Sequence, residues 1–151
     1  MSITIFTDGS CHNRFKTGGW ASIIFIGDEK ITLKGSEFET THHRMELVAV
    51  LEAMKFLETI DRLNYPITIY SDSQYVVNLV VRSERLKISG YKTKKLNPIR
   101  NADLVQSVLH FINAASVTLV KVKSHLRSSD LASVINREVD ILSRHMMRSS
   151  G

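Results

Sequence analysis

The sequence contains a single cysteine, Cys11, only two prolines and no long apolar run in 151 residues. One thiol cannot form an intramolecular disulfide, so a reducing, cytoplasmic location is expected rather than a disulfide-stabilised secreted scaffold. Runs such as WASIIFI are too short to span a bilayer, and the N-terminus lacks the features of a secretion signal. With 43% hydrophobic residues, residues 1–151 are expected to form one globular domain and a monomer without membrane contact.

Positive charge is concentrated in one segment. Residues 82–100 contain seven Lys or Arg and one Glu, a net charge of +6, whereas the whole chain carries +5, so the remainder carries about −1. Such a segment can be an ordinary solvated face. The density of cations, together with Tyr91, favours contact with a polyanion such as nucleic acid.

The spacing of apolar residues predicts a mixed α/β sheet with helices packed on its faces. Residues 3–7 are apolar on both sides, as in a central strand, and two further strands follow over about 19–26 and 30–36. A helical repeat predicts an amphipathic helix over 44–60. The other predicted elements are a strand over 67–72, helices over 73–81 and from about 102, a strand over 116–122, a helix over 134–147 and a polar C-terminal tail over 144–151. The first three strands should form an antiparallel meander, and strands that follow helices should run parallel to the first.

Two of these strands end on an aspartate, Asp8 in IFTDGSC and Asp72 in ITIYSD. Each has an ordinary interpretation: Asp8 begins a common Asp-Gly turn pair, and Asp72 could favour a helix N-terminus where Ser71 and Gln74 resemble a capping box. If the two strands are parallel neighbours, however, both carboxylates lie at the same carboxyl edge of the sheet, the usual place for a site. Because nearby carboxylates repel each other, a cation between them would stabilise the pair.

Glu46 and Asp140 are further acidic candidates, both on predicted helices. Glu46 falls in the first turn of its helix beside the apolar stripe, where a solvated residue favoured by the helix dipole is the ordinary interpretation. Asp140 lies at the edge of the buried face because Val139 points inward. Four carboxylates favour a hard cation such as Mg²⁺. Zinc on His42, Glu46 and Cys11 is disfavoured because the sequence has neither HExxH nor CxxC.

Six short motifs occur in the order and at the spacing found in ribonuclease HI: FTDGSC, RMEL, SDSQYV, GYKT, the KSH of KVKSH and the Asn-x-x-x-Asp of NREVD. The chain therefore resembles the type 1 ribonuclease H family from Ile3 to about Ser143. The resemblance implies a five-stranded mixed sheet with helices on both faces. It also implies hydrolysis of the RNA strand of RNA–DNA hybrids to 5′-phosphate and 3′-hydroxyl ends, with two Mg²⁺ ions, Mn²⁺ as an alternative ion, and no organic cofactor.

The resemblance also assigns roles to individual residues. The family's four metal-binding carboxylates fall on Asp8, Glu46, Asp72 and Asp140, and its mobile histidine, which assists proton transfer or product release, falls on His125. In such a site one ion activates a water and the second stabilises the charge on the leaving 3′ oxygen. The residues expected to contact the hybrid are Cys11, Arg14, Thr41, His42, His43, Gln74 and Asn136, with Tyr91, Lys92, Lys94 and Lys95 in the basic segment.

The sequence departs from the family pattern at several substrate-contacting positions. His42 and His43 replace two asparagines, Arg14 replaces a phosphate-contacting asparagine, and Phe25 stands where arginine is common. The basic segment matches the family's handle but lacks its tryptophans, so a salt-sensitive grip with weaker stacking, on Tyr91 alone, is expected.

The loop that follows the KSH motif is longer than usual and lacks the family's glycine-rich turn. His125 is therefore expected to be held differently while still assisting catalysis. Two alternatives are a catalytically weak or silent hybrid-binding module and a nuclease that cuts DNA. Retention of all four carboxylates disfavours the first, and the RMEL and SDSQYV motifs disfavour the second.

Overall fold

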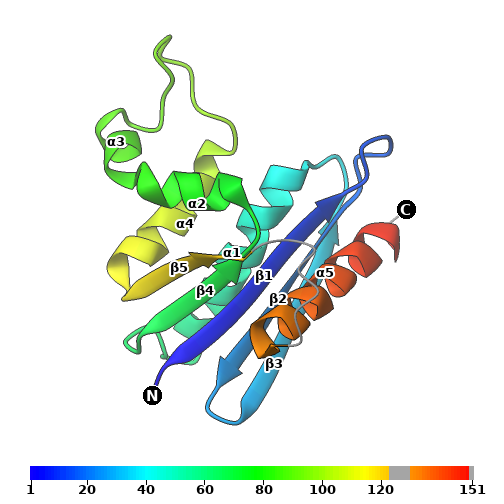
Figure 1. The fold of residues 1–151 in the computed structure, drawn as a ribbon. Coiled ribbons are helices and arrows are strands. Elements are labelled where there is room, and N and C mark those ends of the chain that lie inside the picture. Colours follow the sequence, from blue (N-terminus) through cyan, green and yellow to red (C-terminus); the bar gives the residue numbers. More distant parts are fainter. Residues whose placement is uncertain (123–129, 150–151) are drawn as a thin grey trace.

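The chain folds into a five-stranded mixed sheet covered by helices on both faces (Figure 1). The structure is a computed structural model and describes residues 1–122 and 130–149. The elements are β1 (Ile3–Cys11), β2 (Gly18–Ile26), β3 (Glu29–Glu37), α1 (His42–Thr59), β4 (Ile67–Ser71), α2 (Gln74–Val81), α3 (Ser83–Ile88), α4 (Ala102–Ala114), β5 (Val117–Lys121) and α5 (Leu131–Ser149). None of the helices in these ranges is both long and apolar enough to cross a membrane.

The sheet has the strand order β3-β2-β1-β4-β5. β1 pairs with β2, and β2 with β3, in antiparallel ladders, whereas β1 pairs with β4, and β4 with β5, in parallel. The predicted meander and the predicted parallel strands are both confirmed. β1 is the central strand, and its apolar residues point alternately to the two faces of the sheet.

Two hydrophobic clusters account for the layers. The larger one includes Ile3 and Ile5 of β1 and packs them against α1, α2 and α4. The smaller one places Phe6 of β1 against Ile135 and Val139 of α5, on the opposite face. Figure 1 shows this arrangement: of the helices in the described residues, α5 covers one face of the sheet and the others lie on the opposite side. The apolar character of β1 on both sides therefore reflects burial by helices on both sides.

Two glycines let helices approach the sheet closely beside Asp8. A Cβ on Gly9 would lie 2.4 Å from the backbone nitrogen of Glu46, and a Cβ on Gly19 would lie 2.3 Å from the backbone oxygen of Ser143. Real Cβ atoms are not found that close to backbone atoms. Glycine at these positions therefore sets the distance of α1 and of α5 from the strands.

The structure corrects four local expectations. β1 does not turn after Asp8 but continues to Cys11, because its ladder with β2 continues after β4 has ended. A short helix, α3, lies within the basic segment and buries Leu86. α5 extends to Ser149, so residues 144–149 are helical rather than a tail; the last turns lie against Gly19. The cap of α2 is Ser73, whose hydroxyl accepts a hydrogen bond from the backbone N–H of Val76.

Candidate active site

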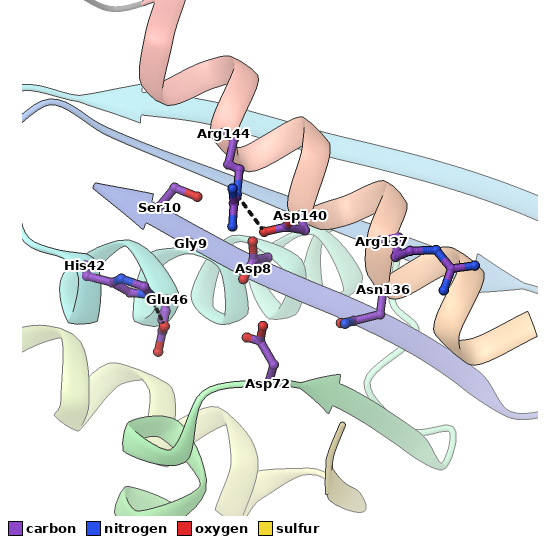
Figure 2. Close-up of a pocket in the computed structure, with 10 residues that line it drawn as sticks. All are labelled: Asp8, Gly9, Ser10, His42, Glu46, Asp72, Asn136, Arg137, Asp140 and Arg144. Carbon is purple, nitrogen blue, oxygen red and sulfur yellow. Dashed lines mark hydrogen bonds and ion pairs between the residues drawn. The ribbon is translucent and has the colours of Figure 1, made fainter. Parts of the chain in front are cut away.

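A pocket of about 450 Å³ opens where β4 ends beside β1 (Figure 2). Its lining residues are Asp8, Gly9, Ser10, His42, Glu46, Asp72, Asn136, Arg137, Asp140 and Arg144. The four predicted carboxylates thus come together from β1, α1, the end of β4 and α5. Figure 2 shows them around one space, whereas the side chain of Arg137 points away from it.

Asp8 and Asp72 are adjacent because of the strand register. Thr7 is paired with Ser71, the last residue of β4, so that Asp8 and Asp72 each follow the last parallel pair. Asp8 is 6% exposed and accepts a hydrogen bond of 2.7 Å from the Ser143 hydroxyl at Oδ2. Burial, and then the negative charges of Asp72 and Asp140, raise the pKa of Asp8 well above its ordinary value. An ionised Asp8 is therefore costly unless positive charge enters the pocket.

Glu46 is buried rather than solvated, contrary to the interpretation from sequence alone. α1 begins at His42, which places Glu46 beyond the first turn, and Gly9 lets this part of the helix lie on β1. Its Oε1 pairs with Nε2 of His42, while Oε2 is buried without a hydrogen-bond partner among the described residues. The hydrogen bond with Glu46 raises the pKa of His42, although partial burial acts in the opposite direction.

Asp140 enters the pocket from α5 on the opposite face of the sheet. Arg144, four residues later on the same helix, donates from Nε to Oδ1 of Asp140 at 3.1 Å. Both side chains are partly exposed, at 50% and 38%, so the pair contributes little to stability. It does place a guanidinium at the rim of an acidic pocket, where an anionic substrate needs positive charge.

The donor chemistry of this pocket suits divalent cations that prefer oxygen. All four candidate ligands are carboxylates, and the charges of Asp72 and Asp140 act unfavourably on that of Asp8. In the part of the chain that the structure describes, Oε2 of Glu46 is a buried acceptor without a donor. As they stand, however, no three His, Cys, Asp or Glu side chains in residues 1–122 and 130–149 lie close enough together to hold one ion. The residues therefore fit a cation by their chemistry, and its binding would draw their side chains together.

Three of the predicted substrate contacts, Cys11, Thr41 and Gln74, have hydrogen-bond partners outside the pocket. Cys11 is partly buried at the end of β1, with Sγ 3.5 Å from the backbone oxygen of Thr40, and burial raises the pKa of its thiol. Thr41 caps α1 by accepting a hydrogen bond from the backbone N–H of Arg44. Gln74, at the start of α2, donates from Nε2 to the side chain of Asn78 at 2.8 Å.

His43 stacks on Tyr75, with ring centroids 4.1 Å apart and ring planes 4° from parallel. Arg14 is exposed in the loop between β1 and β2, with its guanidinium 5.6 Å from the ring of Phe15. The predicted contacts thus divide into two groups. His42 and Asn136 line the carboxylate pocket. The predicted contacts near it that lie outside its lining are Cys11, Arg14, Thr41, His43 and Gln74.

The lysines of the basic segment are exposed, whereas its aromatic ring is partly buried. Lys92, Lys94 and Lys95 are exposed on the loop between α3 and α4, which projects from the body of the molecule in Figure 1. Tyr91 is half-buried and packs against the larger hydrophobic cluster. The expectation that Tyr91 stacks on the substrate stays a prediction, made from a ring that is partly covered by the core.

His125 lies outside the residues that the structure describes. Four residues of the pocket lining, on the other hand, were not among the site residues predicted from the sequence: Gly9, Ser10, Arg137 and Arg144. Ser143, directly behind the pocket, was also missed. A signal for Ser143 and Arg144 was present, because residues three and four positions after Asp140 share its helix face.

The fold and the pocket together define a class of mixed α/β proteins with an acidic pocket where central parallel strands end. The sequence model of the RNase H family matches residues 1–148. Proteins named ribonuclease H from Caldicellulosiruptor saccharolyticus and Syntrophomonas wolfei are each 34% identical to the chain. These alignments cover 97% and 99% of this chain, and 96% and 98% of the relatives. The chain therefore belongs to the RNase H family.

Solved structures show the same fold. The crystal structure of a type 1 RNase H with the type 2 active-site motif matches with a TM-score of 0.78 at 22% identity, over 99% of this chain and 74% of that one. The foamy viral protease-reverse transcriptase, solved in complex with an RNA/DNA hybrid, matches with a TM-score of 0.79 at 16% identity, over 97% of this chain and 20% of that one. The family and the fold class predicted from the six motifs are confirmed, and the family makes the chain a ribonuclease H.

Proposed function

We propose that this chain hydrolyses the RNA strand of RNA–DNA hybrids with two Mg²⁺ ions bound by Asp8, Glu46, Asp72 and Asp140. The observation that supports this proposal is that the four carboxylates, which come from four separate parts of the chain, line one pocket. The chain belongs to the RNase H family, whose activity would require such a site. Oxygen-rich sites of this kind take Mg²⁺, with Mn²⁺ as an alternative. The products would carry 5′-phosphate and 3′-hydroxyl ends.

The chemistry of the pocket follows from its charges. Bound divalent cations would supply a water of lowered pKa and stabilise negative charge on the leaving oxygen. The carboxylates hold these cations, and they repel a phosphodiester when no cation is present. Arg144 and His42 place nitrogen donors at the rim, and the amide of Asn136 adds an uncharged one. These three side chains would orient the sugar-phosphate backbone of the RNA strand on either side of the scissile phosphate. His125 is assigned the transfer of a proton or release of product.

The hybrid would be held mainly through its phosphates on the basic segment. The exposed side chains of Lys92, Lys94 and Lys95 lie outside the pocket and carry positive charge. Such contacts give affinity that falls steeply with salt and carries little sequence preference. Arg14 would add a contact from the loop between β1 and β2. A monomer in a reducing, cytoplasmic setting, where Cys11 stays a free thiol, is part of the same proposal.

A cleavage assay tests this function. Labelled RNA–DNA hybrid is incubated with Mg²⁺ beside duplex RNA, duplex DNA and an EDTA control, with Asp72→Asn and Asp28→Asn run in parallel. Asp28 is exposed in the turn between β2 and β3 and serves as the matched carboxylate control. The proposal requires that only the RNA of the hybrid is cut, and that EDTA and Asp72→Asn abolish cleavage while Asp28→Asn does not. Binding without cleavage in either Mg²⁺ or Mn²⁺ would replace it with the silent hybrid-binding module.

A further inference from the structure

Two serine hydroxyls connect β1 to α5 at the carboxylate pocket: Ser10 is part of the pocket lining, and Ser143 is buried beside it. Ser143 is fully buried, at 0% exposure, although it belongs to a helix whose outer face is solvated. Its Oγ lies 2.7 Å from Oδ2 of Asp8, 2.9 Å from Oγ of Ser10 and 3.0 Å from the backbone oxygen of Asp140. The Ser143 hydroxyl therefore contacts two candidate metal ligands: the side chain of Asp8 and the backbone of Asp140.

The direction of these hydrogen bonds follows from the number of protons. A serine hydroxyl has one proton to donate, and an ionised carboxylate accepts only. Asp8 offers the shorter contact and the negative charge, so Ser143 donates to Asp8 rather than to the carbonyl of Asp140. Ser10 can then donate its own proton to the Ser143 oxygen. The result is a chain of two hydroxyls that ends on Asp8.

The close approach of α5 to β2 makes this contact available. Gly19 has no side chain to separate the strand from the backbone of Ser143. Asp140 and Ser143 are three residues apart and share one face of the helix, so the same approach brings both toward β1. The hydroxyl of Ser143 thus sets the position of Asp8 relative to the helix that carries Asp140.

We propose that Ser143 is a positioning residue, which holds Oδ2 of Asp8 by a charge-assisted hydrogen bond and leaves Oδ1 for a divalent cation. This inference rests on the proposed function in one respect, that Asp8 is a cation ligand. Groups that orient a metal-binding side chain in this way commonly change metal affinity by about 10- to 100-fold when removed. Ser10 strengthens the contact because its donated proton polarises the Ser143 hydroxyl.

A buried serine can also do no more than satisfy the backbone, and the chain contains such a residue as a control. Ser22 on β2 is equally buried, at 0% exposure, and donates to the backbone oxygen of Ala49 at 2.6 Å. It does not line the carboxylate pocket. Alanine at either position removes buried hydrogen bonding, but of the two hydroxyls only that of Ser143 contacts Asp8.

The experiment compares Ser143→Ala, Ser143→Cys and Ser22→Ala with the wild-type chain. Mn²⁺ binding is titrated without nucleic acid, by calorimetry or by electron paramagnetic resonance, and folding is checked by circular dichroism. Ser143→Ala is expected to weaken Mn²⁺ binding by about 10-fold or more. Ser143→Cys keeps a side chain of similar size with a weaker hydrogen-bond donor, so its affinity for Mn²⁺ should lie between those of wild type and Ser143→Ala. This variant tests the proposal even if the alanine variant does not fold. Ser22→Ala should lose thermal stability without a change in Mn²⁺ affinity.

Kinetics provide a second readout that a purely structural role would not give. Ser143→Ala should raise the metal concentration needed for half-maximal cleavage, while the KM for hybrid at saturating metal stays near the wild-type value. If both Ser143 variants bind Mn²⁺ within twofold of wild type, the positioning role is wrong and the proposed function is unaffected. If the wild-type chain itself binds no divalent cation, both proposals fail together.

Discussion

Replacing Asp8 with asparagine should stabilise the metal-free protein while abolishing cleavage. Asp8 is 6% exposed, and burial together with the charges of Asp72 and Asp140 raises its pKa. A carboxyl whose pKa is raised in the folded state binds its proton more tightly there than in the unfolded state. The ionised group therefore lowers the free energy of unfolding. This cost is full above the folded-state pKa, falls as the pH drops below it, and is gone below the unfolded-state pKa. Asparagine removes the charge and keeps a similar shape.

The magnitude follows from the same linkage. Each unit by which folding raises the pKa costs about 1.4 kcal/mol when the group is ionised. The hydrogen bond from Ser143 lowers the pKa of Asp8, and this effect is already contained in the net upward shift. Asp8→Asn is therefore expected to raise the free energy of unfolding at neutral pH, and for a domain of this size each kcal/mol gained raises the Tm by about 2–4 °C.

The assay is thermal and urea unfolding in EDTA at acidic, neutral and mildly alkaline pH, with Asp28→Asn as the exposed control. The difference in the free energy of unfolding between Asp8→Asn and wild type should become smaller as the pH falls. Added Mg²⁺ should also narrow it, because an ion that binds the native state stabilises the wild type preferentially. A variant that is less stable than wild type in EDTA at every pH would show that Asp8 is compensated within the folded chain, and the reasoning would be refuted.

Three further predictions concern packing, pH and salt. Gly19→Ala should lower the free energy of unfolding by about 1–3 kcal/mol in urea, because its Cβ meets the backbone of α5, and it should reduce metal affinity. The pKa of His42 is raised by Glu46, so its stabilising contribution is full below the unfolded-state pKa and lost as the pH rises through the folded-state pKa. In EDTA, His42→Asn should therefore lower the Tm more at acidic than at alkaline pH. Lys94→Ala should flatten the salt dependence of hybrid binding by about one unit of log–log slope, whereas Lys34→Ala should not.

The positions of most helices and strands, and the way the strands pair, could be predicted from the sequence. The apolar spacing of β1, β2 and α1 places each element within a few residues of its observed bounds. The connections then imply the pairing, since hairpins join antiparallel strands and helical crossovers join parallel ones. The same reasoning predicted that Asp8 and Asp72 lie close together. A helix connects into the strand before Asp72, so that strand should be parallel to the first, and parallel neighbours end at the same edge of the sheet.

Other features depended on distances between elements that are far apart in the chain. The burial of Glu46 follows from the contact of α1 with Gly9, and a glutamate beside an apolar stripe gives no sign of it. The half-buried ring of Tyr91 likewise depends on the core beneath the basic segment. In both cases the sequence shows the residue type but not what covers it.

The sequence by itself determined the element order, the strand directions, the family and the identity of the four candidate ligands. These properties are carried by local periodicity, connection length and short motifs, each of which is contained in a continuous stretch of chain. The tertiary structure alone decided that β1 continues to Cys11, that Glu46 is buried and that Ser143 donates to Asp8 across 135 positions of the sequence. The physical reason is that burial and hydrogen bonding depend on how closely two surfaces approach, and here Gly9 and Gly19 set that approach.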